Sequence, residues 1–230
     1  MFCIIITERY KKFTRSDNMK KLILLFAAAA AAVIYIFNAI SGSNINISSI
    51  KKLDGIPMQI TTVQKEGLGP HRYIKAFVTE VVDGDTLEVT YKGETHKVRL
   101  LYIDTPESVK KGTPVQPYAK EASNFTKEFT LNKSVKLVFE KGLRDKYGRL
   151  LAHVMLKNGD YLNGLLVRNG FARVEVVSPN KALQDYFYEL QKRAINEKLG
   201  VWELPEGKQP FVEDENGVYI PKYWLKQKAS

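Results

Sequence analysis

Alternation between hydrophobic and polar positions is dense from Tyr73 to Trp202 and weak on either side of these residues. Segments rich in Val, Thr, Tyr and Leu that follow the two-residue period of a strand cover residues 74–82, 86–91, 96–103, 135–140 and 150–156. Gly84 and the pair Lys92-Gly93 provide turns between the first three of these segments. The pattern therefore predicts five strands.

Three further segments have helical character. In residues 117–131, Ala119, Ala122, Phe125 and Phe129 recur at helical spacing, and residues 161–169 and 180–199 end before Gly170 and Gly200. The order of three strands, a helix, two strands and two helices is typical of a small barrel of the OB-fold type. We predict an α+β fold, a five-stranded OB-fold β-barrel with about three packed α-helices. Other α+β arrangements also satisfy the pattern.

An uninterrupted apolar run covers residues 22–37, directly after Lys20 and Lys21. A positive flank followed by an apolar run is typical of an export segment. No polar face interrupts the run, so a buried soluble helix fits less well. Residues 1–40 are therefore expected to form a leader with an N-terminal hydrophobic helix, which is either a signal peptide or a membrane anchor.

The length of the run leaves both alternatives open. A helix rising ~1.5 Å per residue spans about 24 Å over it, somewhat less than the ~30 Å hydrocarbon core of a bilayer. Ala39 and Ser41 suit a cleavage site, whereas the bulky residues 33–37 favour an anchor. The protein is expected to be exported, with its domain anchored outside the cytoplasm or secreted. The stretch from Met19 onward is typical of a translation start, which favours Met19 over Met1.

The rest of the chain divides by composition. Residues 41–72 are rich in Ser, Asn and Lys without sustained periodicity, which is typical of a flexible linker. Residues 73–202 form the predicted barrel domain. In residues 203–230, three prolines accompany Tyr219, Tyr223 and Trp224. This C-terminal extension is expected to pack on the barrel through its aromatic side chains, and a partner-binding arm is the alternative.

Composition excludes several classes of site. The chain of 230 residues has 35 Lys and Arg against 25 Asp and Glu, a net charge of +10 that favours polyanionic partners, although part of the excess lies before the domain. Cys3 is the only cysteine, so no intramolecular disulfide or cysteine-bound metal cluster is possible. His71, His96 and His153 lie in separate segments without metal-ligand spacing. Neither a zinc site nor a nucleophilic triad is indicated.

The first candidate chemical group is the sequence from Asp83 to Thr86, Asp-Gly-Asp-Thr, at the junction of two predicted strands. Asp and Gly are also the residues that a tight turn requires. The spacing does not match the calcium loop of an EF-hand, which needs more acidic positions before its glycine and a glutamate farther along. By itself this turn is ambiguous.

Arg99 lies in the third predicted strand. Alternation places it on the same face as Leu101 and Ile103, so its guanidinium group would be partly desolvated and would need an anionic partner. Asp104 and Glu107 follow where the strand ends. A simple salt bridge between Arg99 and one of these two carboxylates is the structural alternative to a functional site.

The segment from Asp145 to Arg149 adds a second arginine at another turn, just before a strand. Carboxylates attract hard cations, and paired arginines make multidentate phosphate contacts that lysine cannot reproduce. These parts together predict a phosphodiesterase. In such an enzyme a metal polarises a phosphoryl oxygen, arginines neutralise the developing charge and a carboxylate activates water.

Several ordered motifs carry a family resemblance. They are D-G-D-T at Asp83, R-L-L-Y-I-D-T-P-E at Arg99, K-Y-G-R at Lys146, Gln116-Pro117-Tyr118, Glu121-Ala122, and the segments 166–170 and 198–202. Together they cover roughly residues 73–202. In these motifs the chain resembles the staphylococcal nuclease, or thermonuclease, family.

The resemblance implies a calcium ion bound by the carboxylates of Asp85 and Asp104 and the backbone carbonyl of Thr105, with Asp83 behind these ligands. It also implies a sugar-nonspecific nuclease that acts on single-stranded and double-stranded DNA and on RNA. Such an enzyme cleaves the 5′ P–O bond and leaves 3′-phosphate ends. The protein is expected to be a monomer.

The remaining roles follow from the same resemblance. Glu107 would be the general base or would orient the attacking water. Arg99 and Arg149 would hold the phosphate, with Arg149 also assisting departure of the 5′ oxygen. Lys146 and Tyr147 would contact a neighbouring nucleotide phosphate.

One segment departs from the family pattern. Better-known members carry two tyrosines that line the nucleotide pocket after a motif of the R-Q-G-L-A type, whereas here Arg173 is followed by residues 174–179, Val-Glu-Val-Val-Ser-Pro. Loss of aromatic surface is expected to weaken stacking, worth ~1 to 3 kcal/mol per base. The alternative function is a catalytically weak nucleic-acid-binding or adaptor module on the same barrel.

Overall fold

The computed structural model describes residues 50–53, 65–108 and 114–228. The predicted export helix and most of the predicted linker lie outside these ranges. Within them, no helix combines the length and the apolar character needed to cross a membrane. Residues 50–53 contact the domain, because Lys51 donates its backbone N–H to Asn169 Oδ1 at 2.8 Å and its carbonyl accepts from Asn169 Nδ2 at 3.0 Å.

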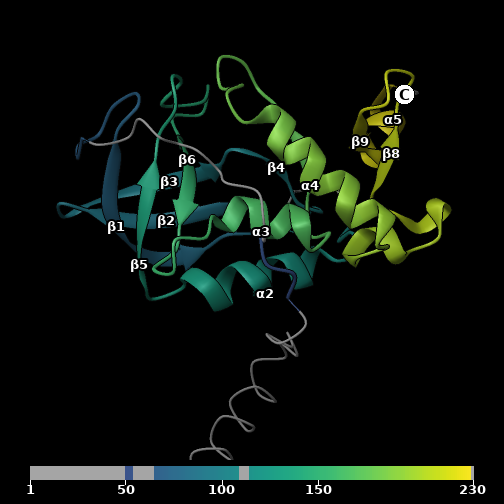
Figure 1. The fold of residues 1–230 in the computed structure, drawn as a ribbon, viewed down its shortest axis with the longest axis horizontal. Coiled ribbons are helices and arrows are strands. Elements are labelled where there is room, and N and C mark those ends of the chain that lie inside the picture. The colour runs from purple at the N-terminus through teal and green to yellow at the C-terminus, as the bar shows by residue number, and fades with distance from the viewer. Residues whose placement is uncertain (1–49, 54–64, 109–113, 229–230) are drawn as a thin grey trace, which may run out of the picture. The chain divides into compact units, whose positions relative to one another are not determined.

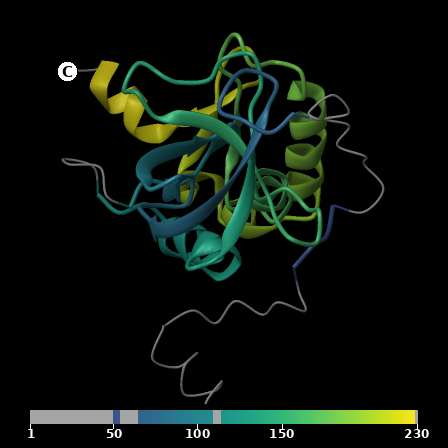
Figure 2. The same ribbon diagram turned by 90° about the vertical axis from the view of Figure 1, so that its left-hand side faces the viewer.

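Five strands close into a barrel in the order β1-β2-β3-β6-β5 (Figures 1 and 2). Their bounds are β1 Tyr73–Val81, β2 Thr86–Tyr91, β3 Glu94–Leu100, β5 Ser134–Val138 and β6 Leu150–Met155. Four of the pairings are antiparallel, and β3 pairs with β6 in parallel, with Val98 opposite Leu150. The predicted α+β class and five-stranded barrel are confirmed.

The barrel is filled by the alternating apolar positions of its strands. Ile74, Val78, Leu87, Val98 and Leu150 are among the fully buried side chains. Complete burial of such a side chain stabilises the fold by about 1.5–3 kcal/mol. The core thus accounts for the strand periodicity seen in the sequence.

Three helices cover the barrel, as predicted: α2 Ala119–Thr130, α3 Leu162–Arg168 and α4 Gln184–Asn196. Helix α3 contacts α2, α4 and β6, and Figure 1 shows it between the barrel strands and α4. Helix α4 begins later than the predicted residue 180. The side chain of Asn180 instead accepts from the Gly142 N–H at 2.7 Å and donates to the Gly142 carbonyl at 3.0 Å, which holds this residue in a loop.

The predicted single strand over residues 96–103 is wrong in one respect. Tyr102 has a left-handed backbone with φ 65°, so the chain turns after β3 and starts a short strand β4, Tyr102–Asp104. Strand β4 pairs with β7, Arg173–Glu175, outside the barrel. The face-sharing of Arg99 with Leu101 and Ile103 is therefore not observed, because alternation does not continue through the turn.

The C-terminal residues form a set of short elements within the same compact unit as the barrel. These elements are η2 Gly200–Glu203, η3 Glu206–Lys208, β8 Phe211–Glu213, β9 Tyr219–Pro221 and α5 Lys222–Lys228. Trp202 and Phe211 are buried together, and Tyr219 packs against Trp202 with ring centroids 4.7 Å apart. The expected packing of the extension through its aromatic side chains is confirmed for this part.

Candidate active site

All nine predicted site residues line one cavity of about 910 Å³. They are Asp83, Asp85, Arg99, Asp104, Thr105, Glu107, Lys146, Tyr147 and Arg149. The cavity lies where the β1–β2 turn, the end of β4, the loop before β6 and helix α5 meet. Residues that are far apart in the sequence are thus brought to one place.

The turn between β1 and β2 is fixed by a glycine. A Cβ atom at Gly84 would lie 2.7 Å from Thr105 Cγ2 and 2.9 Å from Ala122 Cβ, closer than carbon atoms approach. The Gly84 carbonyl accepts from Thr126 Oγ1 of α2 at 2.7 Å. Gly84 therefore lets the turn pack directly on α2 and on the segment that carries Thr105.

Asp85 is buried and anchored by its neighbours. Its Oδ1 accepts from Thr86 Oγ1 at 3.0 Å, and its Oδ2 accepts from the backbone N–H of Thr105 at 2.9 Å and from Thr105 Oγ1 at 3.1 Å. Asp83 Oδ1 in turn accepts from the Asp85 N–H at 3.0 Å. The carboxylate of Asp85 is therefore held in one orientation, facing Arg99.

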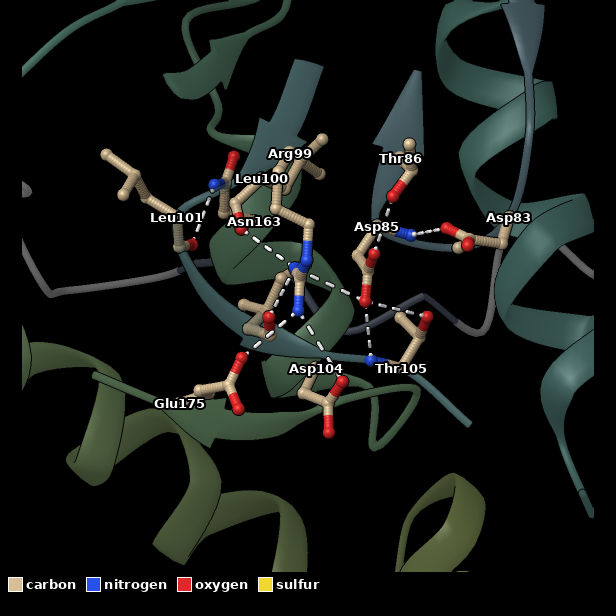
Figure 3. Close-up of polar contacts among 12 residues, drawn as sticks. Asp83, Asp85, Thr86, Arg99, Leu100, Leu101, Asp104, Thr105, Asn163 and Glu175 are labelled. Atoms are coloured by element: carbon tan, nitrogen blue, oxygen red, sulfur yellow. Dashed lines mark hydrogen bonds and ion pairs between the residues drawn. The ribbon is translucent and has the colours of Figure 1, made fainter. Parts of the chain in front are cut away.

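Arg99 is the centre of the site (Figure 3). Its Nη1 lies 3.3 Å from Asp85 Oδ2, and its Nη2 lies 3.2 Å from Glu175 Oε2 and 3.5 Å from Asp104 Oδ1. Burial disfavours the charge on Arg99, but the surrounding carboxylates outweigh burial and raise the pKa of the guanidinium group. The expected anionic partner of Arg99 is confirmed, and the alternative Arg99–Asp104 ion pair is part of the same arrangement.

A second buried arginine supports Asp104. Arg173 Nε donates to Asp104 Oδ2 at 2.9 Å, and Arg173 Nη2 donates to Glu175 Oε1 at 2.8 Å. Arg173 Nη1 reaches the Tyr219 carbonyl at 2.9 Å. Because β4 pairs with β7, this arginine links the acidic end of β4 to the C-terminal segment.

Glu107 lines the cavity at the end of the Asp104 segment. Its backbone is clamped by Gln116, whose Oε1 accepts from the Glu107 N–H at 2.7 Å and whose N–H donates to the Glu107 carbonyl at 3.0 Å. Its side-chain Oε1 accepts from the Tyr223 hydroxyl at 3.2 Å. The carboxylate is thus positioned by both the domain and the C-terminal extension.

Arg149 approaches the cavity from the loop before β6. Asp145 Oδ2 accepts from Arg149 Nε at 2.7 Å, while Asp145 Oδ1 accepts from the backbone N–H groups of Tyr147 and Arg149, each at 2.9 Å. Burial favours the neutral form of Asp145, but these hydrogen bonds outweigh it and lower the pKa of the carboxyl group. A charged Asp145 therefore fixes both the loop and the guanidinium group.

Comparison with known proteins agrees with this geometry. Residues 97–204 match the family model described as "Staphylococcal nuclease homologue". The chain is 43% identical to a thermonuclease from Staphylococcus intermedius over 126 residues, which cover 55% of this chain and 74% of the relative. It is 42% identical over 125 residues to a thermonuclease from Staphylococcus hyicus, with 54% and 73% covered.

The chain belongs to the staphylococcal nuclease family.

A third relative is endonuclease YncB of Bacillus subtilis (strain 168), 39% identical over 148 residues, with 61% of this chain and 69% of the relative covered. The predicted staphylococcal nuclease resemblance is thus confirmed, and with it the enzyme class of phosphodiesterases. Within the chain, the family match includes Arg99, Asp104, Glu107 and Arg149, but it ends before Tyr223 and Trp224.

The charges of the residues in the cavity bear on whether the site suits a calcium ion. The carboxylates of Asp83, Asp85, Asp104 and Glu175 surround only two guanidinium groups, those of Arg99 and Arg173. Burial, followed by the nearby charge of Asp85, raises the pKa of Asp83 to about 7. Burial also raises the pKa of Asp104 to about 7, against the opposing effect of Arg173. The negative charge of these carboxyl groups is thus disfavoured in the present surroundings, and a bound cation would stabilise it.

The type of donor atom fits as well. Asp85 and Asp104 each direct a carboxylate oxygen to the Arg99 guanidinium group, and calcium prefers oxygen ligands. In the described part of the chain, no three His, Cys, Asp or Glu side chains stand in the arrangement of a formed metal site. The residues fit a calcium ion in charge and in donor chemistry.

Sequence reasoning missed several residues of this staphylococcal nuclease site. Arg173 and Glu175 stand two positions apart in β7 and therefore lie on the same face of the strand. Two opposite charges at this spacing in the sequence are compatible with such an ion pair. Asp145 is the first residue of the loop that carries Arg149. An aspartate at the start of a turn commonly accepts a hydrogen bond from the backbone two residues later, as Asp145 does from Tyr147. No signal in the sequence indicated that Tyr223 reaches Glu107.

Proposed function

We propose that this protein is a calcium-dependent, sugar-nonspecific nuclease that acts as a monomer on single-stranded and double-stranded DNA and on RNA. In this proposal it cleaves the 5′ P–O bond and leaves 3′-phosphate ends. One observation carries the proposal. Two arginines, Arg99 and Arg149, and the carboxylate of Glu107 line the same cavity as the acidic cluster around Asp85.

Arg99 and Arg149 would bind the scissile phosphate. Planar guanidinium groups make bidentate contacts with phosphate oxygens and stay charged when buried. Of the three carboxylates that hold Arg99, Glu175 has the most exposed side chain, 28% against 8% for Asp85 and 15% for Asp104. Glu175 is therefore the partner that a substrate phosphate would displace.

Glu107 would accept a proton from water as the water oxygen bonds to phosphorus and the P–O5′ bond breaks. The departing 5′ oxygen takes up a proton and becomes a hydroxyl group, while the phosphate stays on the 3′ side. Arg149 would stabilise the charge on the leaving oxygen, since Asp145 aims its guanidinium group while leaving 29% of the side chain exposed. Lys146 and Tyr147, both exposed on the same loop, would contact the neighbouring nucleotide phosphate.

Asp85, Asp104 and the Thr105 carbonyl would hold the calcium ion. Asp83 would support Asp85, because its Oδ1 accepts from the backbone N–H of Asp85. When bound, the ion supplies charge neutralisation at a phosphoryl oxygen. The support is the surplus of carboxyl groups over guanidinium groups around Arg99 and Arg173.

The test is hydrolysis of a single-stranded DNA and of an RNA by the purified chain across a calcium titration. We expect cleavage that chelation abolishes, with 3′-phosphate ends on the products. The Glu107→Gln variant should lose about 10² to 10⁴ in rate, because proton transfer contributes that much. Near-normal turnover by this variant would remove Glu107 from the mechanism.

Binding of DNA without any cleavage at every calcium concentration would instead favour the adaptor function. The occupied catalytic positions, Arg99, Glu107 and Arg149, support the enzyme rather than the adaptor.

We further propose that the enzyme works outside the cytoplasm. The support is the apolar run 22–37 after Lys20 and Lys21. Zymography of culture fluid and washed membranes, with and without calcium, tests this proposal. Activity confined to the cytosolic fraction would contradict it.

A further inference from the structure

The C-terminal helix α5 forms part of the cavity wall. Tyr223 and Trp224 line the cavity together with the acidic cluster and the Arg149 loop. Both residues lie after residue 204, where the family match ends. The cavity therefore contains aromatic surface that belongs to this chain's extension rather than to the matched domain.

The position of Trp224 is defined by Arg173. The Arg173 guanidinium carbon lies 5.5 Å from the centroid of the Trp224 ring, within the range of a cation–π contact. The same arginine is tied to Asp104 and to the Tyr219 carbonyl, which places the start of α5 beside the acidic cluster. Trp224 remains 38% exposed, so ring surface is left for a ligand.

Tyr223, the preceding residue, faces the reacting region. Its hydroxyl donates to Glu107 Oε1 at 3.2 Å. The Tyr223 and Trp224 rings meet edge to face, with centroids 6.4 Å apart and planes at 87°. A nucleotide whose phosphate lies between Arg99 and Arg149 would therefore have this aromatic corner next to Glu107.

The segment that follows β7 also lines the cavity but supplies no aromatic surface. Val177, Ser178 and Pro179 line the cavity after Glu175, and none of them is aromatic. Among the described residues of the cavity lining, the exposed aromatic side chains are Tyr147, on the Arg149 loop, and Trp224. Aromatic rings beside a phosphate site are the usual platforms for bases of single-stranded nucleic acid.

We propose that Trp224 is a base-stacking residue of the substrate site, provided by the C-terminal extension, and that it holds the base of a nucleotide next to the scissile phosphate. The inference rests on the proposed nuclease function and assigns the residue that contacts the base. It makes the enzyme prefer single-stranded over double-stranded substrate, because a paired base cannot stack on a side chain.

The experiment measures binding of a short single-stranded oligodeoxynucleotide in calcium by the full chain carrying Glu107→Gln, so that the probe is cleaved only slowly. Adding Trp224→Ala should weaken binding about 5- to 100-fold, the usual effect of losing one stacked base. Trp224→Phe should retain most of the affinity. The matched control is Tyr188→Ala, because Tyr188 is also 38% exposed but lies on α4 away from the cavity lining.

A second probe separates stacking from a structural role. An oligonucleotide of the same length with abasic sites keeps its phosphates but has no bases, so it should bind equally to proteins with and without Trp224→Ala. An equal loss of affinity for both probes, or no loss for the normal one, would overturn the proposal.

Fluorescence provides a test that does not depend on the alanine variant folding. Trp202 is only 5% exposed, so quenching by the normal oligonucleotide should come from Trp224 and disappear in Trp224→Phe. Quenching that persists in that variant would contradict the inference.

Hydrolysis by the unmodified chain is measured in parallel. Cleavage without any Trp224 effect removes only this inference, whereas a Trp224-dependent binding effect without cleavage removes only the nuclease mechanism.

Discussion

At the scale of single residues, Arg99 contacts more groups than an arginine in a simple surface ion pair does. It contacts Asp85, Asp104 and Glu175 and also donates from Nη1 to the carbonyls of Leu100 and Ile103 at 3.0 and 2.6 Å. Only a planar group with several N–H donors can satisfy these acceptors together. The fork geometry, rather than the positive charge alone, is therefore what the site requires.

Replacing Arg99 with lysine should lower kcat/KM by about 100-fold or more, because a preorganised phosphate donor is lost while the charge remains. Single-turnover cleavage of a defined oligonucleotide would measure the effect. Lys97→Arg, a charge-preserving change at an exposed position of the same strand, serves as the control. Retention of full activity in Arg99→Lys would show that charge alone suffices.

In the proposed mechanism, Asp145 acts through Arg149, whose guanidinium group it holds. The Asp145→Asn variant should reduce kcat about 10-fold, because the amide cannot hold the guanidinium group and the loop as a charged carboxylate does. KM for a short substrate should change less, since the second arginine, Arg99, is untouched. Asp160→Asn, in a turn outside the cavity, is the matched control. A KM effect without a kcat effect would contradict the positioning role.

Gly84 shows how one residue couples stability to the site. Gly84→Ala should destabilise the protein by about 1–3 kcal/mol, because its Cβ would displace Thr105 and Ala122. Urea unfolding would measure the loss. Gly207→Ala is the control, since a Cβ there meets nothing within 4 Å. Equal stability of the two variants would contradict the packing of this turn.

At the scale of elements, the backbone turn that separates β3 from β4 is supported by a buried polar group. The Tyr102 hydroxyl donates to Glu140 Oε2 at 2.9 Å and accepts from the Leu183 N–H at 3.2 Å, while Glu140 Oε1 lies 2.9 Å from His153 Nε2. The Tyr102 ring also stacks on Phe187, with centroids 4.8 Å apart. These contacts hold the left-handed Tyr102 and, with it, the strand that carries Asp104.

Burial disfavours the charged form of Glu140, but the hydrogen bonds from His153 and Tyr102 outweigh it and lower the pKa below the ordinary 4.5. A lowered carboxyl pKa contributes stability above the unfolded value that is lost as pH falls through the folded value. Glu140→Gln should therefore cost about 1.5–3 kcal/mol near neutral pH and less below pH ~4.5. Urea unfolding at several pH values tests this, with the exposed Glu128→Gln as control. A pH-independent difference would contradict the charged role of Glu140.

The barrel strands could be predicted because their alternation is a local property of β1, β2, β3, β5 and β6. The break at Tyr102 could not, because a tyrosine with positive φ is uncommon and only the contacts with Glu140 and Leu183 stabilise it. A short strand such as β4 carries too few residues to show a period.

The same distinction applies to the site. Asp85, Arg99, Asp104 and Arg149 belong to recognisable local motifs, and the cavity contains them all. Glu175 meets Arg99 across 76 positions of sequence, and Tyr223 meets Glu107 across 116. Such pairs arise from tertiary packing, so no local pattern could indicate them.

At the scale of the whole molecule, the surplus of carboxyl over guanidinium groups around Arg99 should make stability depend on calcium if the proposed ion binds there. If the ion binds only the folded chain, calcium at 100 times its dissociation constant should stabilise the protein by about 2.7 kcal/mol. Thermal unfolding with calcium and with a chelator measures the shift, and magnesium at equal ionic strength is the control. An Asp85→Asn, Asp104→Asn variant should lose the calcium response. Identical unfolding temperatures in calcium and chelator would contradict the site.

Barrel closure brings together Arg99 and Arg149, which lie well apart in the sequence. Arg99 stands near the end of β3 and Arg149 immediately before β6, and these are the two strands that pair in parallel, with Arg99 opposite Leu151. Until that pairing forms, Arg99 and Arg149, which we propose bind the phosphate, have no fixed relation to each other. If the chain is exported as proposed and is kept unfolded for translocation, it would be harmless to the nucleic acids of the cell that made it. The fold itself would then delay the onset of activity until the barrel is complete.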